Sequence, residues 1–245
     1  MEQIQPASER ELKLASSLRV KKYRKANGLF LAEGQKVVSE LFQSFEPYLV
    51  FIQEGSTFTG TPELQRQVSE RQMKQISLLN TPSDVLAIFK GKGSDVIAPR
   101  ELTLALDAIQ NPGNLGTIIR LCDWLGIRQI LCGKGTVDVF NPKVVQSTAG
   151  SLGNVQILEE QDLSKALPQY FDRIIGTDMV GTPYKKATIE EPSKTVLLLG
   201  NEGQGLSPEL RSLCTEILTI PPAETSTGES LNVALSAAII LSHLT

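Results

Sequence analysis

The chain has 245 residues and a net charge of −3, which suit one large globular domain or two modest ones. No apolar run reaches the roughly 18 residues of a membrane span, and the first residues lack the apolar stretch of a secretory signal. We therefore expect a cytoplasmic protein without membrane segments.

Cysteine and histidine usage limits the chemistry further. The cysteines Cys122, Cys132 and Cys214 are scattered without a C-x-x-C pair, so we expect buried free thiols. The only histidine, His243, stands near the C-terminus at the end of an apolar run that we expect to be helical. A histidine-assisted nucleophile and a zinc site are therefore not predicted, and we expect no metal.

The apolar pattern predicts a small α/β module in the first part of the chain. A polar helix is expected over residues 8–18, an amphipathic helix over 34–45 and a strand over 48–52. Short helices are expected over 62–66 and 83–87, where proline and capping residues occur. The glycine-rich stretch Gly91–Asp95 is the best candidate for a domain boundary.

Strands and helices alternate after this boundary. Strands are expected over 102–109, 128–132, 155–158, 173–177, 195–199 and 216–220. Helices are expected over 117–125, 142–152, 163–170, from 207 onward, and over 230–244. This alternation predicts a mostly parallel sheet covered by helices on both faces.

The charge is distributed unevenly along the chain. Residues 1–100 carry 14 Lys and Arg against 11 Asp and Glu, a balance of +3, and the rest carry 10 against 16, a balance of −6. The densest basic stretch, residues 19–25, has five cations and a tyrosine, which could hold phosphates and stack on a base. The candidate RNA-binding residues are Arg19, Lys21, Lys22, Tyr23, Arg24 and Lys25. A solvated helix face is the alternative for such a run, and it stays open.

Three polar loops in the second half carry the strongest functional signal. They are Asn111–Gly116, Gly200–Gly205 and the stretch that ends at Ser230–Asn232, and each lies between a strand and a helix. Open α/β sheets bind ligands at such positions, so we expect one composite pocket. Neither a Walker A loop nor a G-x-G-x-x-G fingerprint is present, which disfavours a nucleotide- or dinucleotide-binding enzyme. Any one of these loops alone could be a structural turn.

The residue types in these loops suggest a charged ligand. Arg120 stands about one helical turn after Gly116 and offers a planar fork of donors to a phosphate or oxyanion. Glu202 is followed by a glycine and could brace Arg120 or reach a ligand. Ser230 and Asn232 begin a helix, whose positive end favours electron-rich groups.

Taken together and in order, these motifs resemble those of the SpoU (TrmH-like) RNA ribose methyltransferases of the SPOUT superfamily. The resemblance covers residues 101–245. The segment from Arg24 to Leu41, with the sequence FLAEG, resembles the small L30e-like domain that often precedes this catalytic domain. It implies an L30e-like RNA substrate-binding domain over residues 1–95 and a methyltransferase domain over residues 101–245.

The resemblance implies a mostly parallel SPOUT-type α/β sheet with a C-terminal trefoil knot, a homodimer formed through the catalytic domain, and S-adenosylmethionine as the cofactor. The implied cofactor-binding residues are Thr177, Leu199, Gly200, Asn201, Gly203, Ile220, Leu231 and Asn232. The implied catalytic residues are Asn114, Arg120, Glu202, Ser230 and Asn232.

The implied reaction methylates a ribose 2′-hydroxyl, and ribosomal RNA is favoured as the substrate. Transfer RNA, or a non-catalytic RNA-binding protein that kept the fold, are the alternatives. We interpret Arg120 as a clamp on the target phosphate, because a guanidinium with a pKa of about 12.5–13.8 is a poor base. Two departures from the family pattern are Asn154, where an arginine often stands, and the long acidic loop Pro221–Glu229.

Overall fold

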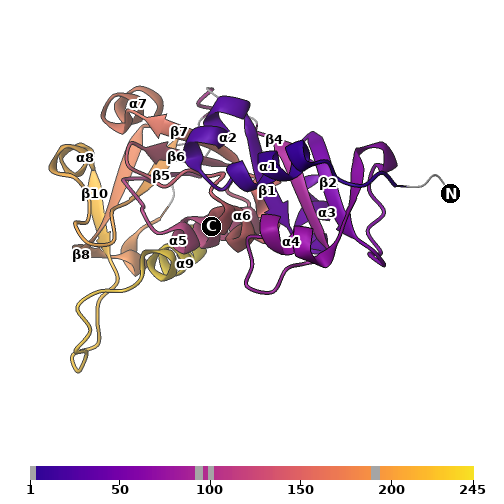
Figure 1. Ribbon diagram of the computed structural model, residues 1–245. Coiled ribbons are helices and arrows are strands. Elements are labelled where there is room, and N and C mark those ends of the chain that lie inside the picture. Colours follow the sequence, from indigo (N-terminus) through magenta and orange to yellow (C-terminus); the bar gives the residue numbers. More distant parts are fainter. Residues whose placement is uncertain (1–3, 92–95, 99–101, 189–193) are drawn as a thin grey trace. The chain divides into compact units, whose positions relative to one another are not determined.

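The computed structural model describes residues 4–91, 96–98, 102–188 and 194–245 (Figure 1). The chain divides into two compact units. The first unit comprises Met1–Lys92 and Asp138–Gly153, and the second comprises Gly93–Val137 and Asn154–Thr245. The chain therefore crosses between the units three times.

The first unit is built around a four-stranded sheet with the order β1-β4-β2-β3. Its strands are β1 (Leu29–Glu33), β2 (Pro47–Gln53), β3 (Gln65–Val68) and β4 (Val85–Lys90). Its helices are α1 (Glu9–Ser17), α2 (Lys21–Asn27), α3 (Gln35–Leu41), α4 (Glu70–Ile76) and α6 (Pro142–Thr148), with the 3-10 turns η1 (Pro62–Leu64) and η2 (Ser151–Gly153). β4 runs antiparallel to both β1 and β2, whereas β3 runs parallel to β2.

Two helices expected in the first unit are wrong. Residues 85–87 of the region expected to be helical over 83–87 lie in the inner strand β4, whose residues from Val85 to Phe89 are all buried. A continuous apolar run of this length fits either a buried strand or a helix. Here it forms a strand, because it pairs with β1 on one side and with β2 on the other. The helix expected over 62–66 is only the turn η1, which leads directly into β3. Most of the basic stretch lies in α2, whose last residue, Asn27, is followed by Gly28 at φ 62°, a left-handed conformation that suits glycine.

The second unit contains a six-stranded sheet in which all neighbouring strands are parallel. The order is β10-β8-β9-β5-β6-β7. Its strands are β5 (Leu102–Leu106), β6 (Gln129–Gly133), β7 (Gln156–Gln161), β8 (Arg173–Pro183), β9 (Thr195–Leu199) and β10 (Glu216–Thr219). Its helices are α5 (Pro112–Trp124), α7 (Leu163–Tyr170), α8 (Pro208–Leu213) and α9 (Val233–Leu244), with the 3-10 turn η3 (Tyr184–Lys186).

Helices cover both faces of this sheet, as the alternation predicted. Leu163, Leu167 and Leu210 pack α7 and α8 onto one face, over a cluster that includes Ala105 and Leu198. Helices α5 and α9 pack against each other (Figure 1). The mostly parallel α/β sheet is therefore confirmed, while the trefoil knot stays a prediction. In the described part of the chain, no helix is long and apolar enough to span a membrane.

The predicted domains differ from the two units mainly in the segment 138–153. Of the stretch predicted as a boundary, residues 92–95 lie outside the described residues. Residues 96–98 fall within the second unit, where Ile97 packs against the apolar cluster under α7. The segment 138–153, which lies within the predicted methyltransferase domain, is part of the first unit.

Candidate active site

The three polar loops of the second unit line one pocket of about 520 Å³. They follow β5, β9 and β10, and the carboxyl ends of parallel strands lie at one edge of a sheet. The pocket is lined by Gln110, Asn111, Asn114, Glu202, Ser230, Leu231, Asn232 and Val233. Its volume falls in the range of about 300–1,000 Å³ of small-molecule sites. The composite pocket predicted from the sequence is therefore present.

Two asparagines begin the helices that border the pocket. The Oδ1 atom of Asn111 caps α5 by accepting backbone hydrogen bonds at 2.8 and 3.2 Å, and that of Asn232 caps α9 with bonds of 2.9 and 3.3 Å. α5 begins at Pro112, whereas the sequence analysis placed its start at Thr117. The first motif is therefore the first turn of a helix, and this turn presents Asn114 to the pocket.

A chain of side-chain hydrogen bonds joins the three loops. Asn232 Nδ2 donates to Asn114 Oδ1 (2.9 Å), and Asn114 Nδ2 donates to Glu202 Oε1 (3.0 Å). The backbone N–H groups of Gln110 and Asn111 also donate to the Glu202 carboxylate, at 3.4 Å each. An ionised carboxylate only accepts, so Glu202 fixes which way the Asn114 carboxamide faces, and Asn114 in turn orients Asn232.

The Glu202 carboxyl is a stronger acid than an ordinary glutamic acid. Partial burial opposes its ionisation, but the hydrogen bonds from Asn114 and from backbone N–H groups outweigh that effect and lower its pKa. The pocket therefore holds one negative charge at neutral pH.

The second loop is shaped by Asn201. Its backbone exchanges two 2.9 Å hydrogen bonds with Gly205, and its Oδ1 atom accepts from two further N–H groups of the loop. Its Nδ2 atom donates to the carbonyl of Ala108 (2.8 Å), which has the left-handed φ of 54°. A Cβ at Gly200 would lie 2.4 Å from the Gly205 carbonyl carbon, so this turn requires glycine. The Asn201 side chain thus ties the second loop to the first.

The other predicted cofactor-binding residues lie in β8 or at the ends of β9 and β10 and in the loops that follow these two strands, and they do not line this pocket. They are Thr177, Leu199, Gly200, Asn201, Gly203 and Ile220. β8, β9 and β10 are neighbours, and the Thr177 hydroxyl donates to the carbonyl of Leu198 in β9 (3.1 Å). Leu231 lines the pocket with 51% of its surface exposed.

This donor set fits the cofactor that the resemblance implies. Exposed apolar surface at Leu231 and the half-buried Ile220 suit an adenine ring, and the loops offer backbone groups for its polar edges. The carboxylate of Glu202 gives the pocket a charge opposite to that of a sulfonium.

Arg120 and Ser230 occupy different positions relative to the pocket. Ser230 lines it, and its hydroxyl makes no hydrogen bond within the described part of the chain. Arg120 is exposed on α5 and does not line the pocket of its own chain, nor does it form an ion pair with any described residue. A brace between Glu202 and Arg120, one of the two roles considered for Glu202, is absent here.

The basic stretch on α2 is only partly available to a partner. Lys21, Lys22, Tyr23 and Lys25 are exposed. Arg24 is buried in an ion pair with Asp138 and has 4% of its side chain exposed, so we withdraw it from the RNA-contacting residues. The Arg19 guanidinium donates to the carbonyls of residues 75 and 77, which engages it within the first unit.

Two of the three cysteines are buried as expected, the third is half-buried, and the histidine stands at the end of a helix as expected. Cys122 and Cys132 are buried free thiols whose pKa is raised by burial, and Cys214 is free and half-buried. His243 stands in the last turn of α9 with Nε2 3.0 Å from the carbonyl of Ala187. The described residues contain no cluster of metal-ligating side chains.

Residues 101–242 match the model of the SpoU rRNA Methylase family. The chain belongs to this family. Residues 9–87 match the model of an MRM3-like substrate binding domain.

Whole-chain relatives agree with membership of the SpoU family. The 23S rRNA (guanosine(2553)-2'-O)-methyltransferase RlmP of Bacillus subtilis is 31% identical over 258 residues, which cover 100% of this chain and 99% of the relative. A solved TrmH-family protein from Porphyromonas gingivalis superposes with a TM-score of 0.86 at 35% identity, covering 97% of each chain. An AdoMet-bound rRNA methyltransferase from Sinorhizobium meliloti superposes with a TM-score of 0.83 at 26% identity, covering 98% of this chain and 95% of that one.

The two departures from the SpoU pattern have defined places in the structure. Asn154 Nδ2 donates to Asp123 (3.1 Å), which also pairs with Arg128. The acidic loop from Pro221 to Glu229 is exposed throughout. Gln110 and Val233 line the pocket but were not predicted as site residues, although each stands directly beside one of the three polar loops in the sequence.

Proposed function

We propose that this chain transfers a methyl group from S-adenosylmethionine to a ribose 2′-hydroxyl of ribosomal RNA. Membership of the SpoU rRNA methylase family supports the reaction class. The observation that carries the proposal in this chain is the hydrogen-bonded series Glu202–Asn114–Asn232, which joins all three family motifs in one pocket.

When bound, S-adenosylmethionine supplies an already activated methyl group, so the chain must mainly position the two reactants. We assign the adenosine to Thr177, Leu199, Ile220 and Leu231 and to the backbone of the second loop, at Gly200, Asn201 and Gly203. Asn201 would contribute its backbone carbonyl, which can accept a second hydrogen bond, because its N–H group and its side-chain polar atoms already bond within the two loops.

The side chains that line the pocket would hold the ribose. A carbon–oxygen bond would form as the methyl–sulfur bond of the cofactor breaks, which leaves S-adenosylhomocysteine, and the hydroxyl proton would pass to water. Ser230 offers an unpartnered hydroxyl at the pocket wall, and Asn232 offers a carboxamide whose orientation Asn114 and Glu202 fix. Arg120 would hold the target phosphate and stabilise the developing negative charge.

A homodimer would explain both the exposed apolar face of the second unit and the position of Arg120. α9 carries few polar residues, yet Leu235 is 59% exposed, and on the adjacent α5 Trp124 is 87% exposed. Such a face is typical of a protein interface. Arg120 is exposed on α5 one turn before Trp124, so dimerisation through α5 and α9 places it at the junction of two copies.

Ligand binding and methyl transfer test this function separately. S-adenosylhomocysteine should raise the melting temperature of the full chain, because a ligand stabilises the state that binds it. Labelled methyl groups should then appear on protein-free large-subunit ribosomal RNA. We also propose that the protein acts in the cytoplasm. An unmoved melting temperature contradicts the cofactor assignment. If the protein binds the cofactor analogue but methylates no RNA, the result favours a non-catalytic RNA-binding protein. Methylation of tRNA alone favours a tRNA methyltransferase.

A further inference from the structure

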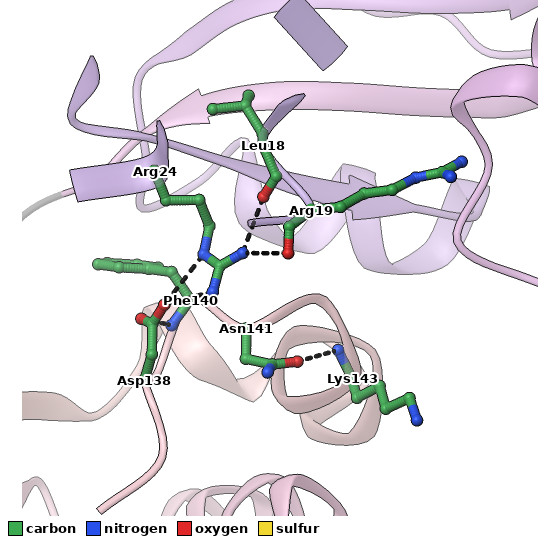
Figure 2. Close-up of polar contacts among 7 residues, drawn as sticks. All are labelled: Leu18, Arg19, Arg24, Asp138, Phe140, Asn141 and Lys143. Carbon is green, nitrogen blue, oxygen red and sulfur yellow. Dashed lines mark hydrogen bonds and ion pairs between the residues drawn. The ribbon is translucent and has the colours of Figure 1, made fainter. Parts of the chain in front are cut away.

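The first unit contains a buried ion pair between residues far apart in the chain. Arg24 and Asp138 have 4% and 6% of their side chains exposed, and the Arg24 Nε atom donates to Asp138 Oδ2 at 3.0 Å (Figure 2). Arg24 Nη1 also donates to the carbonyls of Leu18 and Arg19, at 2.8 Å each. The guanidinium therefore joins the α1–α2 turn, helix α2 and the start of the segment 138–153.

This segment is an integral part of the first unit. The second carboxylate oxygen of Asp138 accepts from the backbone N–H of Phe140 (3.0 Å), and the Phe140 ring stacks on Phe30 with 4.6 Å between centroids. A Cβ at Gly150 would lie 2.7 Å from Cβ of Glu40, so the end of the segment approaches α3 too closely for any larger residue. Helix α6 also packs against β1.

The inward direction of Arg24 sets the outward direction of its neighbours on α2. Lys22 and Tyr23 are exposed, with 46% of Tyr23 accessible, while Arg24 alone in this helix is buried. Asn141, three residues after Asp138, caps α6 by accepting from the N–H of Lys143 (2.9 Å), as Figure 2 shows. Lys143 is exposed and forms no ion pair with any described residue. The ion pair thus brings two short helices with exposed lysines into one unit.

We propose that Arg24 is a positioning residue that fixes α2 and α6 as one RNA-binding surface. Lys22 and Lys143 contact phosphates of a single-stranded RNA segment, and Tyr23 stacks on one of its bases. This rests on the proposed function for the nature of the partner. It extends the surface beyond residues 9–87, the part of the chain that matches the substrate binding domain, because α6 lies at residues 142–148.

Binding of a labelled single-stranded RNA oligonucleotide of mixed sequence to the full chain, at several salt concentrations, tests the surface. Lys143→Gln should raise the Kd about threefold to tenfold and reduce the salt slope by about 0.7, the value for one phosphate contact on a single strand. Lys74→Gln is the matched control, because Lys74 is an exposed lysine of the same unit on α4 and already pairs with Glu70. A Lys143→Gln protein with the Kd and slope of the wild type removes α6 from the surface.

The positioning role of Arg24 is tested by the RNA Kd and its salt dependence, measured on variants that are shown to be folded. Arg24→Gln should raise the RNA Kd and reduce the salt slope although Arg24 is buried and touches no phosphate, and Arg24→Lys should restore part of both. Affinity for S-adenosylhomocysteine should stay unchanged in each variant. A folded Arg24→Gln protein that binds RNA like the wild type overturns the role, and Lys143→Gln decides the surface if Arg24→Gln does not fold. Failure of the wild type to bind S-adenosylhomocysteine would instead count against the proposed function alone.

Discussion

Replacing Asn201 by alanine should loosen the junction between the first two loops. The side chain makes one half-buried bond to the Ala108 carbonyl and two exposed bonds within its own loop. Counting about 1 kcal/mol for the first and about 0.5 kcal/mol for each of the others gives a loss of about 2 kcal/mol. For a chain of this size, at about 3 °C per kcal/mol, the melting temperature should fall by roughly 6 °C. Differential scanning calorimetry measures the change.

Two further variants separate the bond to Ala108 from the bonds inside the loop. Asn201→Asp keeps both acceptor bonds but sets an oxygen against the Ala108 carbonyl, so it should destabilise the chain and weaken S-adenosylhomocysteine binding. Ala108→Gly removes the strain of the left-handed φ of 54° and should leave stability unchanged or raise it. If Asn201→Ala melts within 1–2 °C of the wild type, as about 0.5 kcal/mol would give, the junction does not depend on this side chain.

Three other residues give predictions for activity and assembly. Because hydrogen bonds lower the pKa of Glu202, the contribution of its carboxylate to activity is complete above the usual pKa of a glutamic acid and is lost as pH falls through the lowered pKa. Glu202→Gln should therefore lower kcat/KM by roughly 5–30-fold at neutral pH, and the kcat/KM values of the variant and the wild type should converge in acid. Arg120→Ala should lose about 10²–10³-fold in methyl transfer with cofactor affinity unchanged, and Arg120→Lys should keep part of the activity; near-normal turnover of the alanine variant would remove Arg120 from the mechanism. Leu235→Lys should place a charge on the exposed apolar face and shift the protein toward monomers in sedimentation velocity, whereas an already monomeric wild type would contradict the dimer.

The sheet of the second unit was predictable because its local signals agree with one another. Thr195–Leu199 is buried along its whole length, and short apolar runs of this kind alternate with helical patterns at the spacing of a parallel sheet. The start of α5 was misplaced because the sequence Asn111-Pro112 was taken as part of a loop. Asparagine followed by proline is also a cap and first-turn signal, and the hydrogen bonds of Asn111 show that this meaning applies.

Two features depend on tertiary contacts that no local pattern records. Arg24 lies in a run of lysines, and nothing in that run distinguishes the buried cation from the exposed ones; only the position of Asp138 does so. The region expected to be helical over 83–87 became β4 because two strands pair with it. The pocket residues were easier to predict, since the motifs that carry them lie directly after their strands.

The three crossings of the chain between its units have a consequence for synthesis on the ribosome. The first unit cannot be completed before residues 138–153 have been synthesised, although its other residues end at Lys92. At about 5–20 residues per second, this delay lasts roughly 3–12 s. Until then the Arg24 guanidinium lacks its carboxylate partner and one face of Phe30 lacks the ring that covers it. The N-terminal unit is thus completed only after β5 and β6 of the second unit have been made, so a nascent chain does not display the complete surface that we propose for RNA before much of the second unit has emerged.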